Sequence, residues 1–281
     1  MTEQPGLPQF LIIGAIKAAT TWVTWQLQRH ERIFLPGPEP HYFSREFHRG
    51  PEWYARFFAA ASAGQLRGEK TADYLADPKA AWRIARVLPR IPLIVQLRDP
   101  VERAYSDYCM LLRRGAIDGR PEDYLDPATS TFRRFLENGR YHTHLRRWFD
   151  LFERDRFLIF TLDDVRATPA QTIANCCRHL GVDPPEATAV SVAAINDGAA
   201  AYLPLTLRRM LAPAKRIVAP LRGKPFFAAA RGAIARPIDY PPMSPALRQR
   251  LRDYYRPEIE GTATLLARNL DHWLAAEDAR V

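Results

Sequence analysis

The sequence predicts an α/β fold in which a central, mainly parallel sheet is flanked by helices. Three continuous apolar segments of strand length, residues 10–13, 91–97 and 157–162, alternate with segments whose apolar residues recur at helical spacing. Unbroken apolar strands are typical of a parallel sheet that is covered on both faces. The chain has 281 residues, 47% of them apolar or aromatic, so it can bury a full core, and we expect one domain over residues 1–281.

The helices follow from apolar spacing, taken in chain order. The first begins at Trp22, after a strand and a small-residue loop, and a long helix runs from Pro100 to about Arg114. The other segments with helical spacing are residues 52–63, 78–88, 132–152, 169–180 and 245–273. Residues 115–131 are polar, and residues 200–240 mix prolines with arginine and lysine without a clear period. We expect both of these segments to lie on the surface.

The net charge indicates anionic partners but does not choose between function classes. The chain has 40 Lys and Arg residues against 31 Asp and Glu residues, a net charge of +9 that comes mostly from arginine, which favours phosphate, sulfate or carboxylate partners. Nucleic-acid-binding proteins and enzymes that handle polyanionic small molecules share this balance. The three cysteines are too few for a disulfide framework, and no His or Cys cluster has metal-ligand spacing. We therefore expect reduced cysteines and no metal site.

The N-terminal region is not typical of a membrane span or a secretory signal. Its best apolar run, residues 10–16, is too short to cross a bilayer. No basic region followed by a long apolar stretch precedes it. We expect a soluble, cytoplasmic protein without a transmembrane segment, for which peripheral contact with a membrane stays open.

The loop between the first strand and the first helix has the composition of an anion site. Gly14 ends the strand, and the small residues that follow let oxygen atoms approach the backbone. The start of a helix supplies unpaired N–H groups and the positive end of the helix dipole. Lys17 adds a mobile positive charge, and Thr20 and Thr21 add hydroxyl donors. We therefore predict that this loop binds a phosphate-type group.

Two other function classes stay open at this point. The loop differs from the nucleoside-triphosphatase loop G-x-x-x-x-G-K-[ST], because Lys17 precedes the threonine pair by three residues instead of standing directly before it. A P-loop kinase or triphosphatase that uses ATP and magnesium remains compatible with Asp163 or Asp164 after the third strand. A basic module that binds RNA or another polyanion is the other alternative.

Four blocks in chain order resemble the sulfotransferases that use 3′-phosphoadenosine 5′-phosphosulfate (PAPS), in their heparan-sulfate-type and bacterial branch. The blocks are residues 13–21, 39–43, 68–71 and 98–108. The first resembles the family's 5′-phosphosulfate loop, and the last resembles its 3′-phosphate motif R-[DE]-P-x-x-R-x-x-S-x-[YF]. Residues 139–141 and 269–273 fit the later pattern of the family, so the resemblance covers most of the chain.

The resemblance implies a P-loop-like three-layer sandwich and a transferase activity. The enzyme would move the sulfuryl group of PAPS, in line, to a hydroxyl or, less readily, an amine of a carbohydrate, a glycolipid or another small acceptor. It would release 3′-phosphoadenosine 5′-phosphate (PAP), and would require neither a metal nor a nucleic acid. Residues 115–131 and 200–240 would then lie on the acceptor side.

The resemblance also implies which residues bind the donor. They are Lys17, Ala18, Ala19, Thr20, Thr21, Trp22, Arg98 and Ser106. Lys17 would neutralise charge on the bridging oxygen of the phosphosulfate, and Arg98 and Ser106 would hold the 3′-phosphate.

The residues that take part in the transfer, by the same resemblance, are Lys17, Glu39, His41 and Lys70. Glu39 would remove the proton of the acceptor hydroxyl, and His41 is the rival base because of its intrinsic pKa. Lys70 would bridge the sulfate and the acceptor. The chain departs from the usual family residues at three positions, where Ala19 replaces Gly, Pro38 replaces Lys and Ala72 replaces Pro. An alanine predicts a negative φ at position 19.

Overall fold

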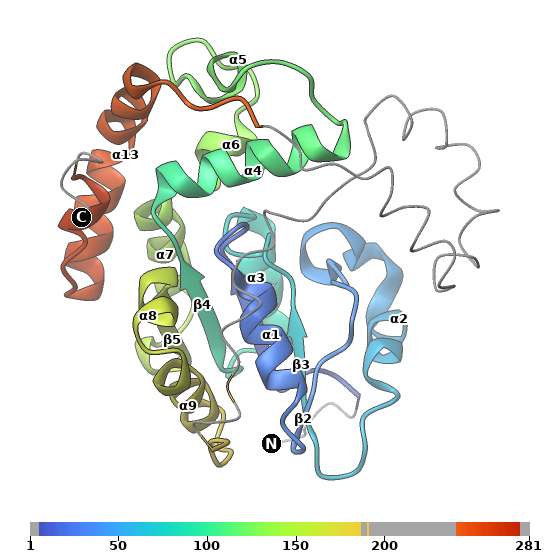
Figure 1. The fold of residues 1–281 in the computed structure, drawn as a ribbon. Helices are drawn as coiled ribbons and strands as arrows, with labels where there is room; N and C mark the ends of the chain where they lie inside the picture. Colours follow the sequence, from blue (N-terminus) through green and yellow to red (C-terminus); the bar gives the residue numbers. More distant parts are fainter. Residues whose placement is uncertain (1–5, 187–189, 191–239, 276–281) are drawn as a thin grey trace, which may run out of the picture.

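The computed structural model describes residues 6–186, 190 and 240–275, and it confirms the predicted α/β architecture (Figure 1). The sheet has five parallel strands in the order β2-β3-β1-β4-β5. The strands are β1 (Phe10–Gly14), β2 (Ile33–Phe34), β3 (Leu66–Lys70), β4 (Leu93–Leu97) and β5 (Phe157–Thr161). Helices cover both faces of this sheet, so the described part of the chain is a three-layer sandwich.

The α-helices of the described residues are α1 (Thr20–Gln28), α2 (Gly50–Ala55), α3 (Pro78–Val87), α4 (Pro100–Arg114), α5 (Pro121–Leu125), α6 (Arg134–Glu137), α7 (Tyr141–Phe149), α8 (Leu162–Ala167), α9 (Pro169–His179) and α13 (Pro245–Leu266). A π-helical turn, η1, spans Tyr42–Glu46, and four short 3₁₀ turns are η2 (Phe47–Arg49), η3 (Arg56–Phe58), η4 (Arg154–Arg156) and η8 (Asp271–Trp273). Within the described ranges, no helix combines the length and apolar character that crossing a bilayer requires.

Two of the five strands are absent from the sequence prediction. Strands β1, β4 and β5 match the three predicted apolar segments to within two residues at each end. Strand β3 carries charged residues and β2 is only two residues long, so neither shows the apolar signal of a buried strand. Strand β3 lies so close to the side chain of Phe10 on β1 that only glycine fits at position 68. A Cβ atom there would lie 2.0 Å from Cζ of Phe10.

Some of the predicted helical segments are divided or shorter in the structure, and one predicted polar segment contains a helix. Segment 132–152 forms two helices, α6 and α7, with a break at Gly139, where a Cβ atom would lie 2.8 Å from the hydroxyl of Tyr255. The segment 52–63 ends its helical part at Phe58, and the polar segment 115–131 contains the short helix α5. Residues 200–239 of the second predicted surface segment lie outside the described residues.

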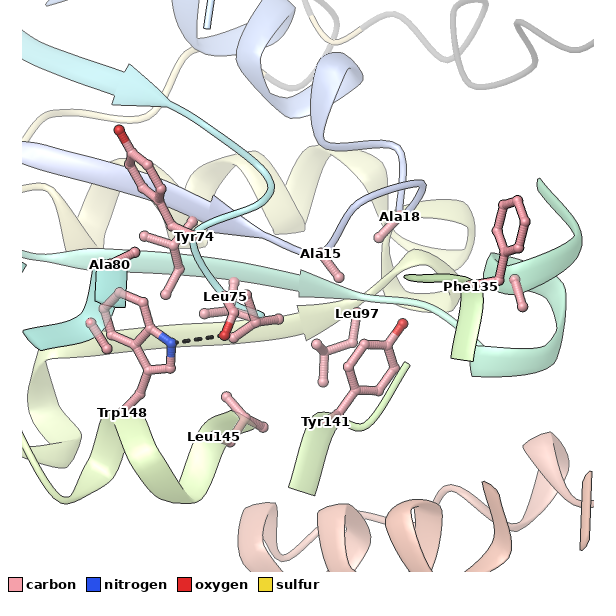
Figure 2. Packing of buried hydrophobic residues seen from close by; sticks show 14 of the residues in the cluster. Ala15, Ala18, Tyr74, Leu75, Ala80, Leu97, Phe135, Tyr141, Leu145 and Trp148 are labelled. Carbon is pink, nitrogen blue, oxygen red and sulfur yellow. Dashed lines mark hydrogen bonds between the residues drawn. The ribbon is translucent and has the colours of Figure 1, made fainter. Parts of the chain in front are cut away.

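The core consists of two clusters, one on each face of the sheet. Alternate residues of β1 enter different clusters: Leu11 and Ile13 pack toward α3, α4 and α7, and Phe10 and Ile12 pack toward α1 and α9. Figure 2 shows part of the first cluster, in which Nε1 of Trp148 donates a hydrogen bond of 3.0 Å to the carbonyl oxygen of Leu75. This contact ties α7 to the loop that follows β3.

A buried ion pair joins α4, α6 and α13. The side chains of Arg103 and Asp107 on α4 are both 0% exposed, with 3.5 Å between Nη1 and Oδ2. Arg134 of α6 donates two hydrogen bonds to Asp107, at 3.2 and 3.0 Å. Arg103 also donates to the carbonyl oxygen of Phe135, which accepts a second hydrogen bond, of 3.2 Å, from the hydroxyl of Tyr255 on α13. One buried carboxylate therefore anchors the middle of α4.

The substitution Asp107→Ala tests this anchor. We expect it to lower the free energy of unfolding by about 3–5 kcal/mol, because it leaves the buried Arg103 guanidinium without its carboxylate. Denaturant unfolding measures the change. The control is Asp253→Ala, which removes a 58% exposed carboxylate that lies 3.7 Å from Arg256, and we expect it to cost about 1 kcal/mol or less. Equal losses in the two variants would contradict an anchoring role for Asp107.

Glu69, at the end of β3, is a second buried carboxyl group. Its side chain is 0% exposed and accepts hydrogen bonds from the hydroxyls of Tyr54 and Thr71. Its partners are thus hydroxyls, although a cation is the usual expectation for a buried carboxylate. Burial raises the pKa of Glu69 to about 7. The native fold therefore favours the protonated carboxyl.

The raised pKa of Glu69 predicts a stability that falls with rising pH. In the unfolded chain the carboxyl titrates near 4.5, so the native state binds more protons between about pH 4.5 and 7. Its contribution is complete below pH 4.5 and is lost as the pH rises through 7. We expect Glu69→Gln to be more stable than the wild type at pH 8 by about 3 kcal/mol, a difference that disappears at pH 4.

Denaturant unfolding at several pH values measures this difference. The control Glu260→Gln changes a side chain that is 60% exposed, and we expect its stability relative to the wild type to stay constant over the same range. A Glu69→Gln variant that is less stable than the wild type at pH 8 would contradict the prediction.

Candidate active site

The parallel order of the strands brings three loops to one edge of the sheet. The carboxyl ends of β1, β3 and β4 meet there, because these strands are neighbours and run in the same direction. The register places Ile12 opposite Lys70 and Gly14 opposite Val95. In Figure 1 this is the end of the sheet that α4 crosses. The predicted site residues on these loops therefore lie along a single edge.

The loop after β1 makes two left-handed backbone turns before α1 begins. Lys17 has a φ of 66° and Ala19, the N-cap residue of α1, has a φ of 64°. The prediction of a negative φ at Ala19 is thus wrong: the loop has to reverse sharply into α1, and that geometry outweighs a cost of about 1 kcal/mol for alanine in this region. Alternation of left-handed and right-handed residues turns backbone N–H groups toward one side, which suits an anion.

The residues around the start of α1 differ in how deeply they are buried. Ala18 and Thr20 are buried, and Thr21 is exposed. The side chain of Trp22 belongs to the cluster beneath α1 and α9, and its backbone N–H donates 2.9 Å to the carbonyl oxygen of Ala19. The structure therefore places the Trp22 indole in the core, and donor binding by this residue stays a prediction.

Arg98 links the loop after β1 to the end of β4. Its Nη1 donates a hydrogen bond of 3.2 Å to the carbonyl oxygen of Lys17. Its Nη2 lies 4.0 Å from the carboxylate of Glu102 in the first turn of α4, a long distance for an ion pair. The hydroxyl of Tyr141 donates 2.9 Å to the carbonyl oxygen of Arg98. Ser106 follows two helical turns later on α4 and is half-buried.

The side chain of Lys17 lies in a positively charged, partly buried environment. Burial lowers the pKa of Lys17 below its ordinary value, and the nearby charges of Arg113 and Arg98 lower it further. Asp107 acts in the opposite direction. A concentration of cations of this kind favours an anionic ligand at the loop.

Glu39 and Lys70 form the second part of the site. Lys70, the last residue of β3, donates through Nζ to Oε1 of Glu39. The backbone N–H of Ala72 lies 3.4 Å from Oε2 of the same carboxylate. His41 lies next to this pair, with 3.7 Å between its Nε2 and Oε2 of Glu39. The structure thus brings Glu39, His41 and Lys70 together, as their predicted roles require.

Two residues that contact the predicted site were missed from the sequence. Asp73 accepts a hydrogen bond of 3.0 Å from Nδ1 of His41, and Tyr141 holds the backbone at Arg98. Asp73 follows Lys70 by three residues, so a carboxylate just beyond a strand end was the available signal. Tyr141 stands in the block 139–141, which matches the family pattern without showing what it contacts.

Asp163 and Asp164 make structural contacts near the C-terminal region instead of facing an anion loop. Asp164 caps α8 through Thr161 and pairs with Arg268. Asp163 accepts hydrogen bonds of 3.0 Å from Nε1 of Trp273 and 3.1 Å from Nε2 of His272. Among the residues that the structure describes, no group of three or more His, Cys, Asp or Glu side chains is arranged to hold a metal ion.

Relatives of known activity resemble this chain over about two thirds of its length. A heparan sulfate glucosamine 3-O-sulfotransferase 3B1 of Mus musculus is 30% identical over 185 residues, which cover 63% of this chain and 46% of the relative. A bifunctional heparan sulfate N-deacetylase/N-sulfotransferase 2 of Homo sapiens is 30% identical over 197 residues, with 63% and 22% covered. The matched region is thus half or less of the length of these relatives.

The fold has a counterpart among solved structures. The crystal structure of a sulfotransferase from Alicyclobacillus acidocaldarius superposes with a TM-score of 0.71 at 20% identity, covering 95% of this chain and 99% of that one. The family model described as the sulfotransferase domain matches residues 7–194, more than half of the chain. Because this match covers more than half of the residues, the chain belongs to the sulfotransferase family.

Proposed function

We propose that this protein transfers the sulfuryl group of PAPS to a hydroxyl group of a saccharide, a glycolipid or another small acceptor, with an amine as the second acceptor class. Family membership supports the reaction type. The relatives named as a 3-O-sulfotransferase and an N-sulfotransferase support a saccharide hydroxyl or amine as acceptor. The observation that carries the proposal is that the Lys17–Arg98 contact and the Glu39–Lys70 contact lie on neighbouring strand ends.

The donor would be held at both ends. The loop after β1 supports binding of the 5′-phosphosulfate through the N–H groups at the start of α1, the hydroxyls of Thr20 and Thr21, and the ammonium group of Lys17. Arg98 and Ser106 would hold the 3′-phosphate, because a guanidinium group matches a phosphate with two parallel hydrogen bonds. The hydrogen bond from Arg98 to the carbonyl oxygen of Lys17 keeps the two anion sites in a constant relation.

The transfer would use the residues of both contacts. The acceptor oxygen forms the new S–O bond while its proton passes to the carboxylate of Glu39, and the bond from sulfur to the bridging oxygen breaks. That oxygen leaves on the 5′-phosphate of PAP, where the charge of Lys17 stabilises it. Lys70 contacts Glu39 in the structure, which supports a position between the carboxylate and the sulfate.

Donor binding separates this function from its alternatives. We expect PAP to raise the thermal stability of the protein, by about 2.7 kcal/mol at a concentration one hundred times its Kd, and ATP with magnesium to have little effect. Arg98→Ala should weaken PAP binding by about tenfold or more, through loss of charge-assisted hydrogen bonds.

Calorimetric titration with PAP measures that loss. The control is Arg32→Ala, at an exposed arginine just before β2, at the opposite end of the sheet, and we expect it to keep the wild-type Kd. Stabilisation by ATP and magnesium without an effect of PAP would favour a kinase or triphosphatase. Steeply salt-dependent binding to any polyanion, without a nucleotide effect, would favour a polyanion-binding module.

The catalytic base is tested by comparing Glu39→Gln with His41→Ala. We expect Glu39→Gln to keep PAP binding and to lower the rate of sulfate transfer by about a hundredfold or more, as for loss of a general base. We expect a smaller loss, about tenfold, in His41→Ala. Transfer of labelled sulfate from PAPS to heparan sulfate, and to a panel of glycolipids and amino sugars, measures both rates.

The opposite order would assign the base to His41. A hundredfold loss in His41→Ala with near-wild-type transfer in Glu39→Gln would overturn the role proposed for Glu39.

A further inference from the structure

Asp73, in the loop after β3, is held by three groups of the turn that follows the proposed base Glu39. Its Oδ2 lies 3.0 Å from Nδ1 of His41 and 2.9 Å from Nη2 of Arg45. Its Oδ1 accepts a hydrogen bond of 3.0 Å from the hydroxyl of Ser44. The carboxylate is only 12% exposed. With three defined partners and little contact with water, Asp73 has one orientation relative to the imidazole.

His41 is constrained on its backbone as well as on its ring. Its φ of 52° lies in the left-handed region, and it precedes the π-helical turn η1. A non-glycine residue keeps this conformation only where its surroundings impose it. Its backbone N–H lies 3.4 Å from the hydroxyl of Thr71, so both the backbone and the ring contact the loop after β3. The ring is thereby placed with Nδ1 toward Asp73 and Nε2 toward Glu39.

We propose that Asp73 is a positioning residue of the transfer reaction, which keeps the proton of neutral His41 on Nδ1 so that Nε2 receives the proton that Glu39 removes from the acceptor. This inference rests on the proposed function. An ionised carboxylate only accepts hydrogen bonds, so the Nδ1 that faces Asp73 has to be the donor. In the neutral ring the other nitrogen then carries a lone pair. Proton transfer requires the distance of 3.7 Å from Nε2 to Glu39 to shorten when substrate binds, as is common for catalytic hydrogen bonds.

The proton balance of this step is complete without another reagent. The acceptor hydroxyl gives its proton to Glu39, and the protonated Glu39 passes it to Nε2 of His41. The imidazolium then lies between the carboxylates of Asp73 and Glu39, which stabilise its charge. The side chain of His41 is 31% exposed, so water can take the proton when the product leaves. Glu39 is a free carboxylate again for the next cycle.

Several charged groups face His41, and they set its pH dependence. They are Asp73 from the loop after β3, Glu39 from the proposed site, Arg45 from η1 and the buried Glu69 of β3, and Lys70 contacts Glu39 on its other oxygen. The hydrogen bond with Asp73 raises the pKa of His41, the carboxylate of Glu39 raises it further, and burial and Arg45 oppose this. These charges make the neutral ring a stronger proton acceptor, and the proposed relay starts from the neutral form, whose share grows as the pH rises.

The wild-type protein gives the first test, independent of any acceptor. Ring-nitrogen NMR over pH 5–9 should show neutral His41 with its proton on Nδ1, and a pKa that falls in Asp73→Asn. A wild-type ring whose neutral form carries its proton on Nε2 would overturn the proposal. The same measurement in Asp163→Asn is the control, because Asp163 also contacts a histidine ring, His272, and an arginine, Arg166. We expect no change at His41 in this control.

Kinetics give the second test, with PAPS as donor and heparan sulfate as acceptor. We expect Asp73→Asn to lower kcat by about tenfold and to change the KM for PAPS by less than about twofold. In a His41→Ala background, we expect the same substitution to cause no further loss of kcat. An equal loss in both backgrounds, or no loss in the single variant, would overturn the proposal.

Failure of the proposed function gives a different result. Absence of sulfate transfer by the wild type to every acceptor would refute the sulfotransferase proposal itself. The position of the His41 proton is measured without transfer, so a ring protonated on Nε2 would refute the role of Asp73 alone.

Discussion

The hydrogen bond from Arg98 to the carbonyl oxygen of Lys17 is the constraint on which the rest of the site depends. It spans the gap between two neighbouring parallel strands and joins the loop after β1 to the start of α4. Lys17 and Ala19 both have left-handed backbones, and such conformations persist only where surrounding contacts hold them. The arginine that would bind one end of the nucleotide therefore also shapes the loop that would bind the other end.

Helix α4 carries this constraint because it is anchored along its length. Its N-terminus is capped by Asp99, whose carboxylate accepts from the backbone N–H of Val101 at 2.8 Å. Its middle is anchored by the buried pair of Arg103 and Asp107. The block 98–108, which resembles a phosphate motif, thus contains two arginines with different surroundings. Arg98 lies at the site, and Arg103 is fully buried. The buried pair would keep Arg98 and any ligand of α4 in a constant position, because an ion pair without solvent contact tolerates little displacement.

The sequence predicts the framework of the fold better than its irregular parts. The three most apolar strands and the helix from Pro100 to Arg114 follow from periodicity, because burial on both faces leaves a strong local signal. Strand β3 lacks that signal, since its charged side chains have partners that lie far away in the sequence: Tyr54 for Glu69 and Glu39 for Lys70. No local pattern encodes such partners.

The site shows the same division between local and distant information. The residues of the matched blocks could be named from their order along the chain, and the structure brings Glu39, His41 and Lys70 together. The left-handed φ of Ala19 could not be predicted, because the tertiary contacts of the loop override the preference of alanine. Asp73 also escaped prediction: its contact with His41 joins residues 32 positions apart, through the pairing of β2 with β3.

The arrangement of charges around Glu39 explains why a histidine and a second carboxylate accompany the proposed base. A carboxylate beside an ammonium group such as Lys70 accepts a proton only if the resulting acid can release it before the next cycle. His41 offers a proton acceptor on the side of Glu39 that Lys70 does not occupy, and Asp73 stabilises the charged ring at its far nitrogen. Lys70 ends β3 and Asp73 follows it by three residues, so one strand end contacts both the proposed base and the histidine that would accept its proton. This arrangement follows from β3 lying beside β2, which places the end of β3 and the loop after it next to the segment that carries Glu39 and His41.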